Sequence, residues 1–158
     1  MKYNRVKAAC IIIIVLLSGS SIVRGQQATD SLEIIQRMHS FTEAFSNLQW
    51  DEFISFFATD ASAFFPPSAK FANRADDKTA IENVFRNVFA TAIKAKKSPP
   101  YLSIIPLQQK IQMAGNIAIV SFLLRDPAML GRRTIVLEKR SGIWLIIHLH
   151  ASGVLLTD

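Results

Sequence analysis

The stretch that decides the fold is GIWLIIHLHASG, which runs from Gly142 to Gly153. It is a long apolar run, rich in β-branched residues and bracketed by glycines, which is typical of a β-strand. Strict alternation would place on one face Trp144, Ile146, His148 and His150, and on the other Leu145, Ile147, Leu149 and Ala151. A β-bulge would swap this assignment of faces. We predict that this is the last strand of a strongly curved sheet.

Three more extended segments precede this strand, at residues 102–113, 117–125 and 132–139, and short turn-like links separate them. Short links demand antiparallel neighbours, so the four strands are expected to form a meander. Both faces of the last strands are largely apolar, whereas a sheet with helices on one side should leave its other face wet. We therefore expect a homodimer that buries the second face of the sheet.

The part of the chain before the meander reads as three helices. Apolar residues recur at helical spacing over residues 32–47, with Asp30 as the expected cap. A short helix over residues 50–57 and a brief extended piece over 61–65 follow. The third helix has three candidate caps, Asp76, Asp77 and Thr79. Helices first and a sheet afterwards predict an α+β fold, with the three helices packed on one face of a curved antiparallel sheet.

The N-terminus reads as a targeting segment rather than as part of the fold. Basic residues precede an uncharged run from Ala8 to Val23, and Val23-Arg24-Gly25 resembles a cleavage site. Residues 1–25 are therefore predicted to be a signal peptide, and residues 26–158 the domain of a secreted or periplasmic protein. The alternative is an uncleaved anchor, because the uncharged run approaches the length that spans a membrane. A membrane contact is expected only through this segment.

The net charge of +6 comes largely from the same segment. Four of the 18 Lys+Arg lie in it, which leaves 14 against 12 Asp+Glu, or about +2 for the domain. A nucleic-acid partner is not expected, because that function needs a concentrated basic face. Cys10 is the one cysteine and falls in the predicted signal, so neither a disulfide nor a Cys-ligated metal is expected in the domain, and no cofactor is predicted.

The order of elements resembles that of a known superfamily. A helix, a short helix, Asp60-Ala61 before a short strand, a third helix, and a meander ending in Trp144, His148, His150 and Ser152 are similar to the nuclear transport factor 2-like superfamily. The ending resembles SnoaL-like proteins and the association domain of calcium/calmodulin-dependent kinase II most. The resemblance covers about residues 29–153 and implies a cone with an apolar pocket between the helices and the sheet.

Two departures bear on the activity that this resemblance implies. Ketosteroid isomerases place a catalytic carboxylate just before the proline that follows Asp-Ala, and Phe65 stands there in this chain. The kinase association domain carries pocket arginines on its last two strands, where the matching residues here are Ile135 and Ala151. The resemblance therefore implies an apolar pocket without the best-known chemistry of these relatives, and the fold alone does not define an activity.

His148 and His150 are the candidate catalytic residues. They lie two residues apart on a strand, so both side chains point the same way and could serve in acid–base chemistry. A metal would need a further ligand, for which His39 and Glu138 are the candidates. The alternative is that both histidines pack in the core or in an interface.

An apolar ligand would be held by seven residues in this reading: Tyr101, Phe64, Phe41, Ile135, Ile147, Leu149 and Ala151. Arg132 and Arg133 are expected to mark a strand edge kept soluble by charge. We expect a secreted SnoaL-like domain that binds a small apolar ligand or acts as a dimerisation module. The alternative is an isomerase, cyclase or dehydratase that uses His148 or His150 as its base and Tyr101 as a hydrogen-bond donor.

Overall fold

The computed structural model describes residues 27–66, 69, 71, 73–96, 98–125 and 129–156. The predicted signal peptide, residues 1–25, lies outside this part of the chain, and its cleavage stays a prediction. The chain divides into two compact units, Met1–Ile35 and Gln36–Asp158. The described residues of the first unit are helical throughout, and the second unit holds the sheet and the other helices.

Among the described residues there are three helices, as the sequence predicts. They cover residues 27–47, Trp50–Ser55 (α2) and Lys78–Ala95 (α3). Residues 27–29 are already helical, so the prediction that Asp30 caps the first helix is wrong. Asp77 does cap α3, because its carboxylate accepts a hydrogen bond of 2.7 Å from the Ala80 backbone N–H. Of the helices described, none combines the length and the apolar character that crossing a membrane requires.

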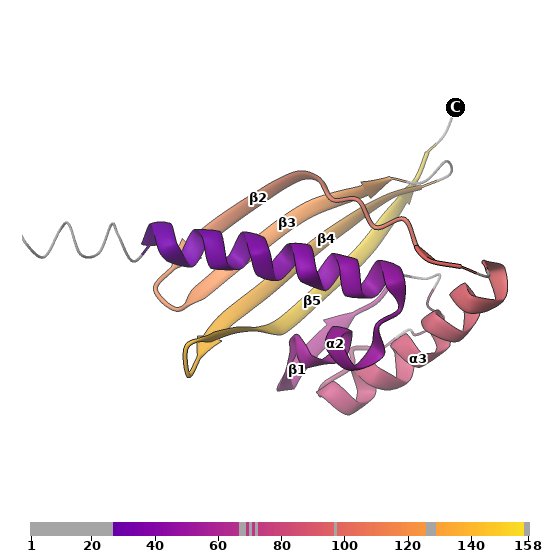
Figure 1. Cartoon of the computed structure of the whole chain (residues 1–158), viewed down its shortest axis with the longest axis horizontal. Helices are drawn as coiled ribbons and strands as arrows, with labels where there is room; N and C mark the ends of the chain where they lie inside the picture. The colour runs from indigo at the N-terminus through magenta and orange to yellow at the C-terminus, as the bar shows by residue number, and fades with distance from the viewer. Residues whose placement is uncertain are drawn as a thin grey trace, which may run out of the picture. The chain divides into compact units, whose positions relative to one another are not determined.

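Five strands form one mixed sheet in the order β1-β5-β4-β3-β2 (Figure 1). Their bounds are Phe57–Phe64 (β1), Leu107–Ala114 (β2), Ile117–Arg125 (β3), Met129–Arg140 (β4) and Ile143–Leu155 (β5). Strands β2 to β5 pair antiparallel in chain order, which confirms the predicted meander. β1 joins the free side of β5 in parallel. The predicted α+β fold class is confirmed, with a sheet that is mixed because of β1.

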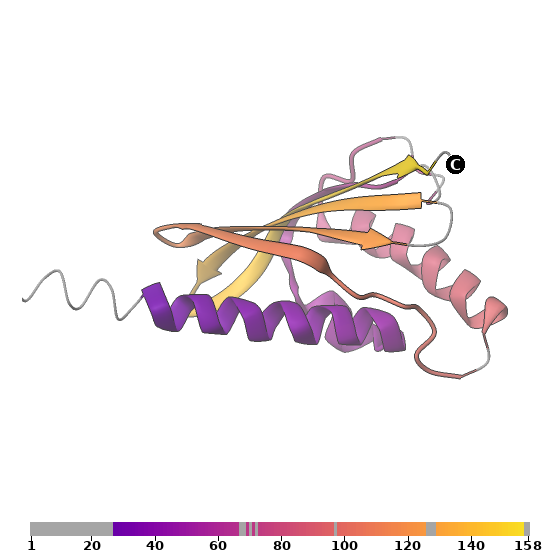
Figure 2. The same cartoon turned by 90° about the horizontal axis from the view of Figure 1, so that it is seen from above.

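The helices of the second unit pack on one face of this sheet, which we call the inner face; the opposite one is the outer face (Figure 2). Arg37, on the first helix, donates a hydrogen bond of 3.0 Å from Nε to the carbonyl oxygen of Trp144 on β5. Phe41, one turn further on, lies with its ring 5.9 Å from that of Phe57 on β1. These contacts anchor the helix from Gln36 onward to the side of the sheet formed by β5 and β1.

Phe53 of α2 is the centre of the helical core. Its side chain is fully buried, and its ring lies between 4.7 and 5.6 Å from five others, those of Phe41, Phe45, Phe57, Phe85 and Phe89. Packed aromatic pairs at such distances stabilise a fold beyond the area that they bury. The cluster joins the first helix, α2, α3 and β1, so these phenylalanines are core residues.

A β-bulge interrupts the pairing of β5 with β4 at Ile147. On β4, Leu137 is paired with Ile146 and Val136 with His148, so Ile147 has no partner across the ladder. One extra residue on a strand shifts the alternation of its side chains by one position. Before Ile147 the even-numbered residues of β5 therefore face one side of the sheet, and after it the odd-numbered residues face that side.

The bulge produces the swapped assignment of faces. On both sides of it the buried residues lie on the inner face, where each is at most 6% exposed: Trp144, Ile146, Leu149 and Ala151. The outer face receives Leu145 before the bulge and His148 and His150 after it. Strict alternation, which would keep the histidines on the side of Trp144, is wrong for this strand.

The bulge can be tested by replacing each of two adjacent residues, Leu149 and His150, with alanine. Leu149→Ala is expected to lower the free energy of unfolding by about 2–5 kcal/mol, because it empties a buried site. His150→Ala removes an exposed side chain and is expected to cost about 0.5 kcal/mol or less. Urea unfolding followed by circular dichroism measures both. A larger cost at His150 than at Leu149 would contradict the bulge, since strict alternation buries His150.

Candidate functional site

Strands β1 and β5 bring four side chains together on the outer face. Ser62 and Phe64 lie in register beside His148 and His150. Ser62 Oγ is 2.9 Å from His148 Nδ1, which is hydrogen-bond distance. The Phe64 ring lies 6.0 Å from the ring of His148 and 5.9 Å from that of His150. The predicted catalytic pair thus sits on the side of the sheet away from the helices, beside a hydroxyl and an aromatic ring.

His148 is held toward its neutral form. Partial burial lowers its pKa, and His150 and Arg74 lower it further, because each disfavours a second positive charge nearby. In a neutral imidazole one nitrogen donates and the other accepts, so the tautomer decides whether the Ser62 hydroxyl donates to Nδ1 or accepts from it. A neutral and oriented imidazole is chemically able to accept a proton.

The residues considered as further metal ligands lie elsewhere. His39 Nδ1 is 3.7 Å from Glu43 Oε2, one turn further along the same helix. Glu138 accepts a hydrogen bond of 2.6 Å from Arg140. In the part of the chain that the structure describes, no three side chains of His, Cys, Asp or Glu are gathered closely enough to hold a metal ion. His148 and His150 are therefore an isolated pair in this respect.

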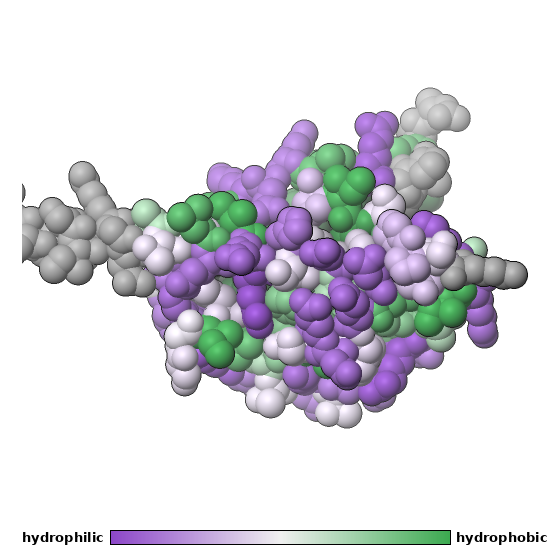
Figure 3. Space-filling model, viewed as in Figure 1, coloured by the Kyte–Doolittle hydropathy of each residue, from purple (hydrophilic) through white to green (hydrophobic). Residues whose placement is uncertain are grey.

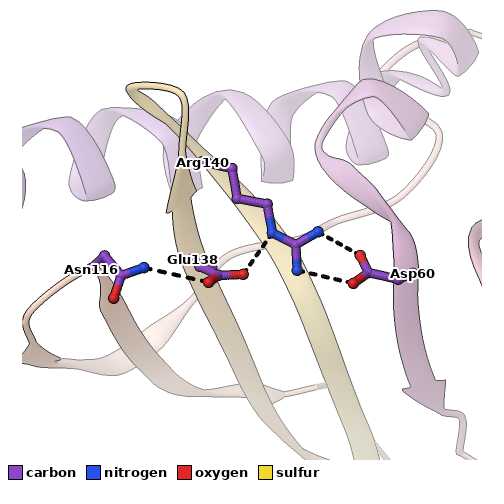
Figure 4. Close-up of polar contacts among 4 residues, drawn as sticks. All are labelled: Asp60, Asn116, Glu138 and Arg140. Carbon is purple, nitrogen blue, oxygen red and sulfur yellow. Dashed lines mark hydrogen bonds and ion pairs between the residues drawn. The ribbon is translucent and has the colours of Figure 1, made fainter.

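Arg140 ties β4 to β1 across the intervening strand β5 (Figure 4). Its Nη1 and Nη2 donate to the two carboxylate oxygens of Asp60 at 2.6 and 3.0 Å, and its Nε donates to Glu138. Asn116 in the turn between β2 and β3 donates to the other oxygen of Glu138 at 3.4 Å. The hydrogen bond from Arg140 lowers the pKa of Asp60. These groups are largely exposed, so the cluster orients the strands and its net contribution to stability is small.

The seven residues predicted to line an apolar pocket do not share one surface. Three of them, Ile135, Leu149 and Ala151, lie on the inner face, and Phe41 of the first helix belongs to the core packed on it; all four are between 0% and 6% exposed. Phe64 lies on the outer face and is 41% exposed, and Ile147 is the bulge residue. Tyr101 lies in the segment between α3 and β2, where its backbone N–H donates to the carbonyl of Ser46 at 2.8 Å. The structure therefore brings together only the inner-face group.

Phe65 occupies the position at which the ketosteroid isomerases carry a carboxylate. Its ring lies 5.3 Å from that of Phe85 and 5.9 Å from that of Phe71. The side chain thus packs against aromatic neighbours at this end of β1. Phe65 therefore contributes apolar packing at this position and has no group that could act as a base.

Arg133 is a candidate functional residue that the sequence analysis missed. β4 lies between β3 and β5, so the expectation that Arg132 and Arg133 mark a strand edge is wrong. Arg133 pairs with the buried Phe122 and Ala151, which places it on the inner face, whereas Arg132 is exposed on the outer face. Strand alternation could have found it, because Arg133 shares its parity with the buried Ile135.

A groove of about 390 Å³ lies between the first helix and the segment that precedes β2. Polar and apolar residues both line it: His39, Thr42, Glu43, Ser46, Asn47, Pro100, Ile104, Ile105 and Pro106. Of the residues predicted for a site, the candidate metal ligand His39 lines this groove, whereas His148 and His150 do not.

The comparison with protein families agrees with this architecture. The family model described as SnoaL-like domain matches residues 34–157, and the chain belongs to this family. A search of curated proteins found no significant relative. The family is therefore established over residues 34–157.

Solved structures of similar fold come from several kinds of protein. An NTF2-like protein of unknown function from Pseudomonas putida superposes with a TM-score of 0.64 at 20% identity, over 79% of this chain and 87% of that one. A candidate dehydratase of the NTF2-like family from Streptomyces avermitilis gives 0.67 at 15% identity, over 82% and 99%. The association domain of kinase II from C. elegans gives 0.56 at 14% identity, over 80% and 98%. At these identities the likeness shows the fold alone.

The lowered pKa of His148 predicts a specific dependence of stability on pH. The unfolded chain takes up a proton on this residue near its ordinary pKa of about 6.5, before the folded protein does. The melting temperature is therefore expected to be maintained above that pH and to fall as the pH drops below it. His148→Gln should remove most of this fall, and His39→Gln on the exposed helix serves as the control. Wild type and His148→Gln losing the same melting temperature between pH 7.5 and 5.5 would contradict it.

Proposed function

We propose that this protein is an exported SnoaL-like domain that self-associates through the outer face of its sheet and holds a small molecule on the inner face. The observation that carries the proposal is the division of β5 at Ile147, which gives the two faces separate roles. The buried residues on both sides of the bulge pack into the core from the inner face. His148 and His150 lie on the outer face, beside exposed apolar side chains.

The outer face is more apolar than a solvated sheet face requires. Large apolar side chains on it are about 40% to 54% exposed, including Phe64 at 41%, Ile119 at 39% and Ile143 at 54%. Apolar exposure on a contiguous surface marks an interaction site. Figure 3 views the molecule from the side of the first helix and shows hydrophilic residues with separate apolar patches there. The exposed apolar side chains of the sheet support placing the contact between copies on the outer face.

The arrangement of charge on the outer face also supports self-association. The register places a neutral row across its middle: Ile119, Val136, His148 and Ser62. Charged groups surround this row: Arg140, Glu138 and Asp60 lie toward one end of the strands, Arg132 toward the other, and Lys110 on the edge strand β2. A neutral centre with a charged rim is the usual anatomy of a protein interface. The fold is shared with kinase association domains, which favours the same reading.

A ligand on the inner face is the second part of the proposal. Ile135, Leu149 and Ala151 are buried on this face, at 0%, 5% and 6% exposure, and form the core beneath the proposed site. Leu124 and Met129 lie on the same face nearer the ends of their strands and are partly exposed. A mostly apolar surface with few polar groups is the usual composition of a small-molecule site.

Export rests on the N-terminal sequence, with its basic start, uncharged run and Val23-Arg24-Gly25. The intact mass of the protein recovered outside the cytoplasm tests it. A mass for a chain that starts at Gln26 supports cleavage, and a membrane-bound chain that retains residues 1–25 supports the anchor instead.

One observation favours an enzyme as the second candidate. His148 is kept neutral and is oriented by Ser62, which is the arrangement of a general base. An isomerase or dehydratase activity would then use the outer face, within reach of the exposed Phe64. His148→Gln separates the two functions, because it removes a base but retains a hydrogen-bonding side chain of similar reach. Loss of turnover with an intact dimer would indicate the enzyme.

Self-association is tested by placing a charge at the centre of the neutral row. Val136→Arg is expected to convert the dimer to a monomer, because two copies would bring unpaired arginines into a buried contact. Thr91→Arg, which adds the same charge at an exposed position of α3, is the matched control and should remain dimeric. Sedimentation velocity measures both. A wild-type monomer at about 100 μM, or a dimer retained in Val136→Arg, would contradict the proposed interface.

A further inference from the structure

A cation lies on the inner face of the sheet among apolar side chains. Arg133 is half-buried, and its partners across the ladders are Phe122, 5% exposed, and Ala151, 6% exposed. Its neighbour of the same parity on β4, Ile135, is fully buried. A charge in such surroundings loses hydration and requires compensation.

The protein compensates this charge only in part. Arg133 Nη1 donates to the carbonyl oxygens of Arg132 and Ser152, each at 2.9 Å. A guanidinium carries five N–H groups, and within the part of the chain that the structure describes the Nε–H and both Nη2–H groups have no hydrogen-bond partner. Burial lowers the pKa of Arg133. The two bonds to backbone carbonyls fix the direction of the guanidinium, while they bring no negative charge to it.

Four acids of the described residues are paired with other arginines. Asp60 and Glu138 bind Arg140, Asp76 binds Arg74, and Glu82 pairs with Arg86. Among residues 27–66, 73–96, 98–125 and 129–156, no ion pair of Arg133 with an acid is found. This arginine is therefore positioned by the backbone and not by an internal counter-ion.

The backbone beneath the guanidinium is shaped to receive it. A Cβ added to Gly131 would lie 3.1 Å from Arg133 Nη1 and 3.3 Å from Nη2. Gly131 is paired with Gly153, over which the side chain of Met129 lies. The absence of side chains at both glycines lets the flat guanidinium and the Met129 thioether lie against the sheet. The result is a fixed cation bordered by a polarisable apolar side chain.

We propose that Arg133 forms the anion-binding end of the inner-face site and that the ligand of this protein is a small apolar molecule bearing one carboxylate. The guanidinium would bind the carboxylate through Nε and Nη2, the fork geometry that matches two oxygens. The apolar body of the ligand would lie along Leu124 and Met129, which are partly exposed on the same face. This inference names the class of ligand for the proposed ligand site and rests on that part of the proposed function.

The test compares an acid with its neutral isostere. The probes are 2-naphthoate and 2-naphthamide, titrated by calorimetry at pH 7.5 into protein expressed from the full chain in a secreting host. Wild type is expected to bind the acid at least tenfold more tightly than the amide, since a hydrogen bond to a charged group is worth about 1.5–3 kcal/mol. Arg133→Gln should lower the affinity for 2-naphthoate to that for 2-naphthamide, and should leave the affinity for the amide unchanged.

Arg132→Gln is the matched control, because it removes the same charge from the adjacent residue on the other face of the sheet. It should keep the preference for the acid. If circular dichroism shows that Arg133→Gln does not fold, Arg133→Lys is the second variant. It keeps the positive charge but lacks the paired N–H donors of the guanidinium, so it is expected to retain only part of the preference for the acid over the amide. Equal loss in Arg132→Gln, or an acid bound as tightly by Arg133→Gln as by wild type, overturns the inference.

The two proposals fail in different ways. Wild type that binds the amide and the acid equally keeps the ligand site and overturns the role of Arg133. Wild type that binds neither probe up to millimolar concentration overturns the inner-face ligand site together with this inference. In that case the association proposed for the outer face is untouched, because sedimentation measures it separately.

Discussion

One unpaired residue, Ile147, sets the chemistry of both faces of this sheet. With strict alternation, β5 would bury His148 and His150 beside Trp144 and would turn Leu149 and Ala151 to the outside. The bulge reverses this after Ile146, so the apolar residues of both half-strands reach the core. A buried pair of histidines would need partners for four ring nitrogens in an apolar environment. The bulge avoids that cost and leaves the imidazoles on a surface.

The pairing of β1 with β5 is also irregular near the bulge. β1 pairs with β5 at Phe57 and again from Ser62 on, and the chain between them departs from the ladder. Asp60 lies in that departure and is held from β4 by Arg140. The ion pair therefore spans the point at which both strands lose regular pairing. Beyond it, Ser62 and Phe64 return to register beside the histidines, which places a hydroxyl 2.9 Å from His148.

The fold was accessible from the sequence because its signals are local. Helical spacing, the cap at Asp77 and the short turns of the meander define the elements and their order without reference to distant residues. The faces of the last strand were not accessible, because Ile147 is an ordinary strand residue and nothing in its type marks a bulge. The parallel pairing of β1 joins residues far apart in the chain, and it too leaves no local signal.

The candidate site divides in the same way. Alternation correctly groups His148 with His150, but it cannot say which face the pair occupies. The adjacent Arg132 and Arg133 suggest a strand edge kept soluble by charge, whereas the parity of the strand assigns the two arginines to opposite faces. Two adjacent charged residues on a strand can thus comprise one that faces outward and one that faces inward. The proposed ligand class depends on the inward one.

The three histidines allow a direct measurement of how the two faces are used. Diethylpyrocarbonate modifies exposed imidazoles, and mass spectrometry reads each site while protein concentration is varied. His39, whose side chain is 77% exposed, should react at every concentration and serves as the internal standard. We expect His148 and His150 to react in dilute protein and in the Val136→Arg monomer, and to become protected as wild-type copies associate. Histidines that stay unreactive in the Val136→Arg monomer until it unfolds would contradict the bulge, and wild-type histidines that react equally at all concentrations would contradict the association.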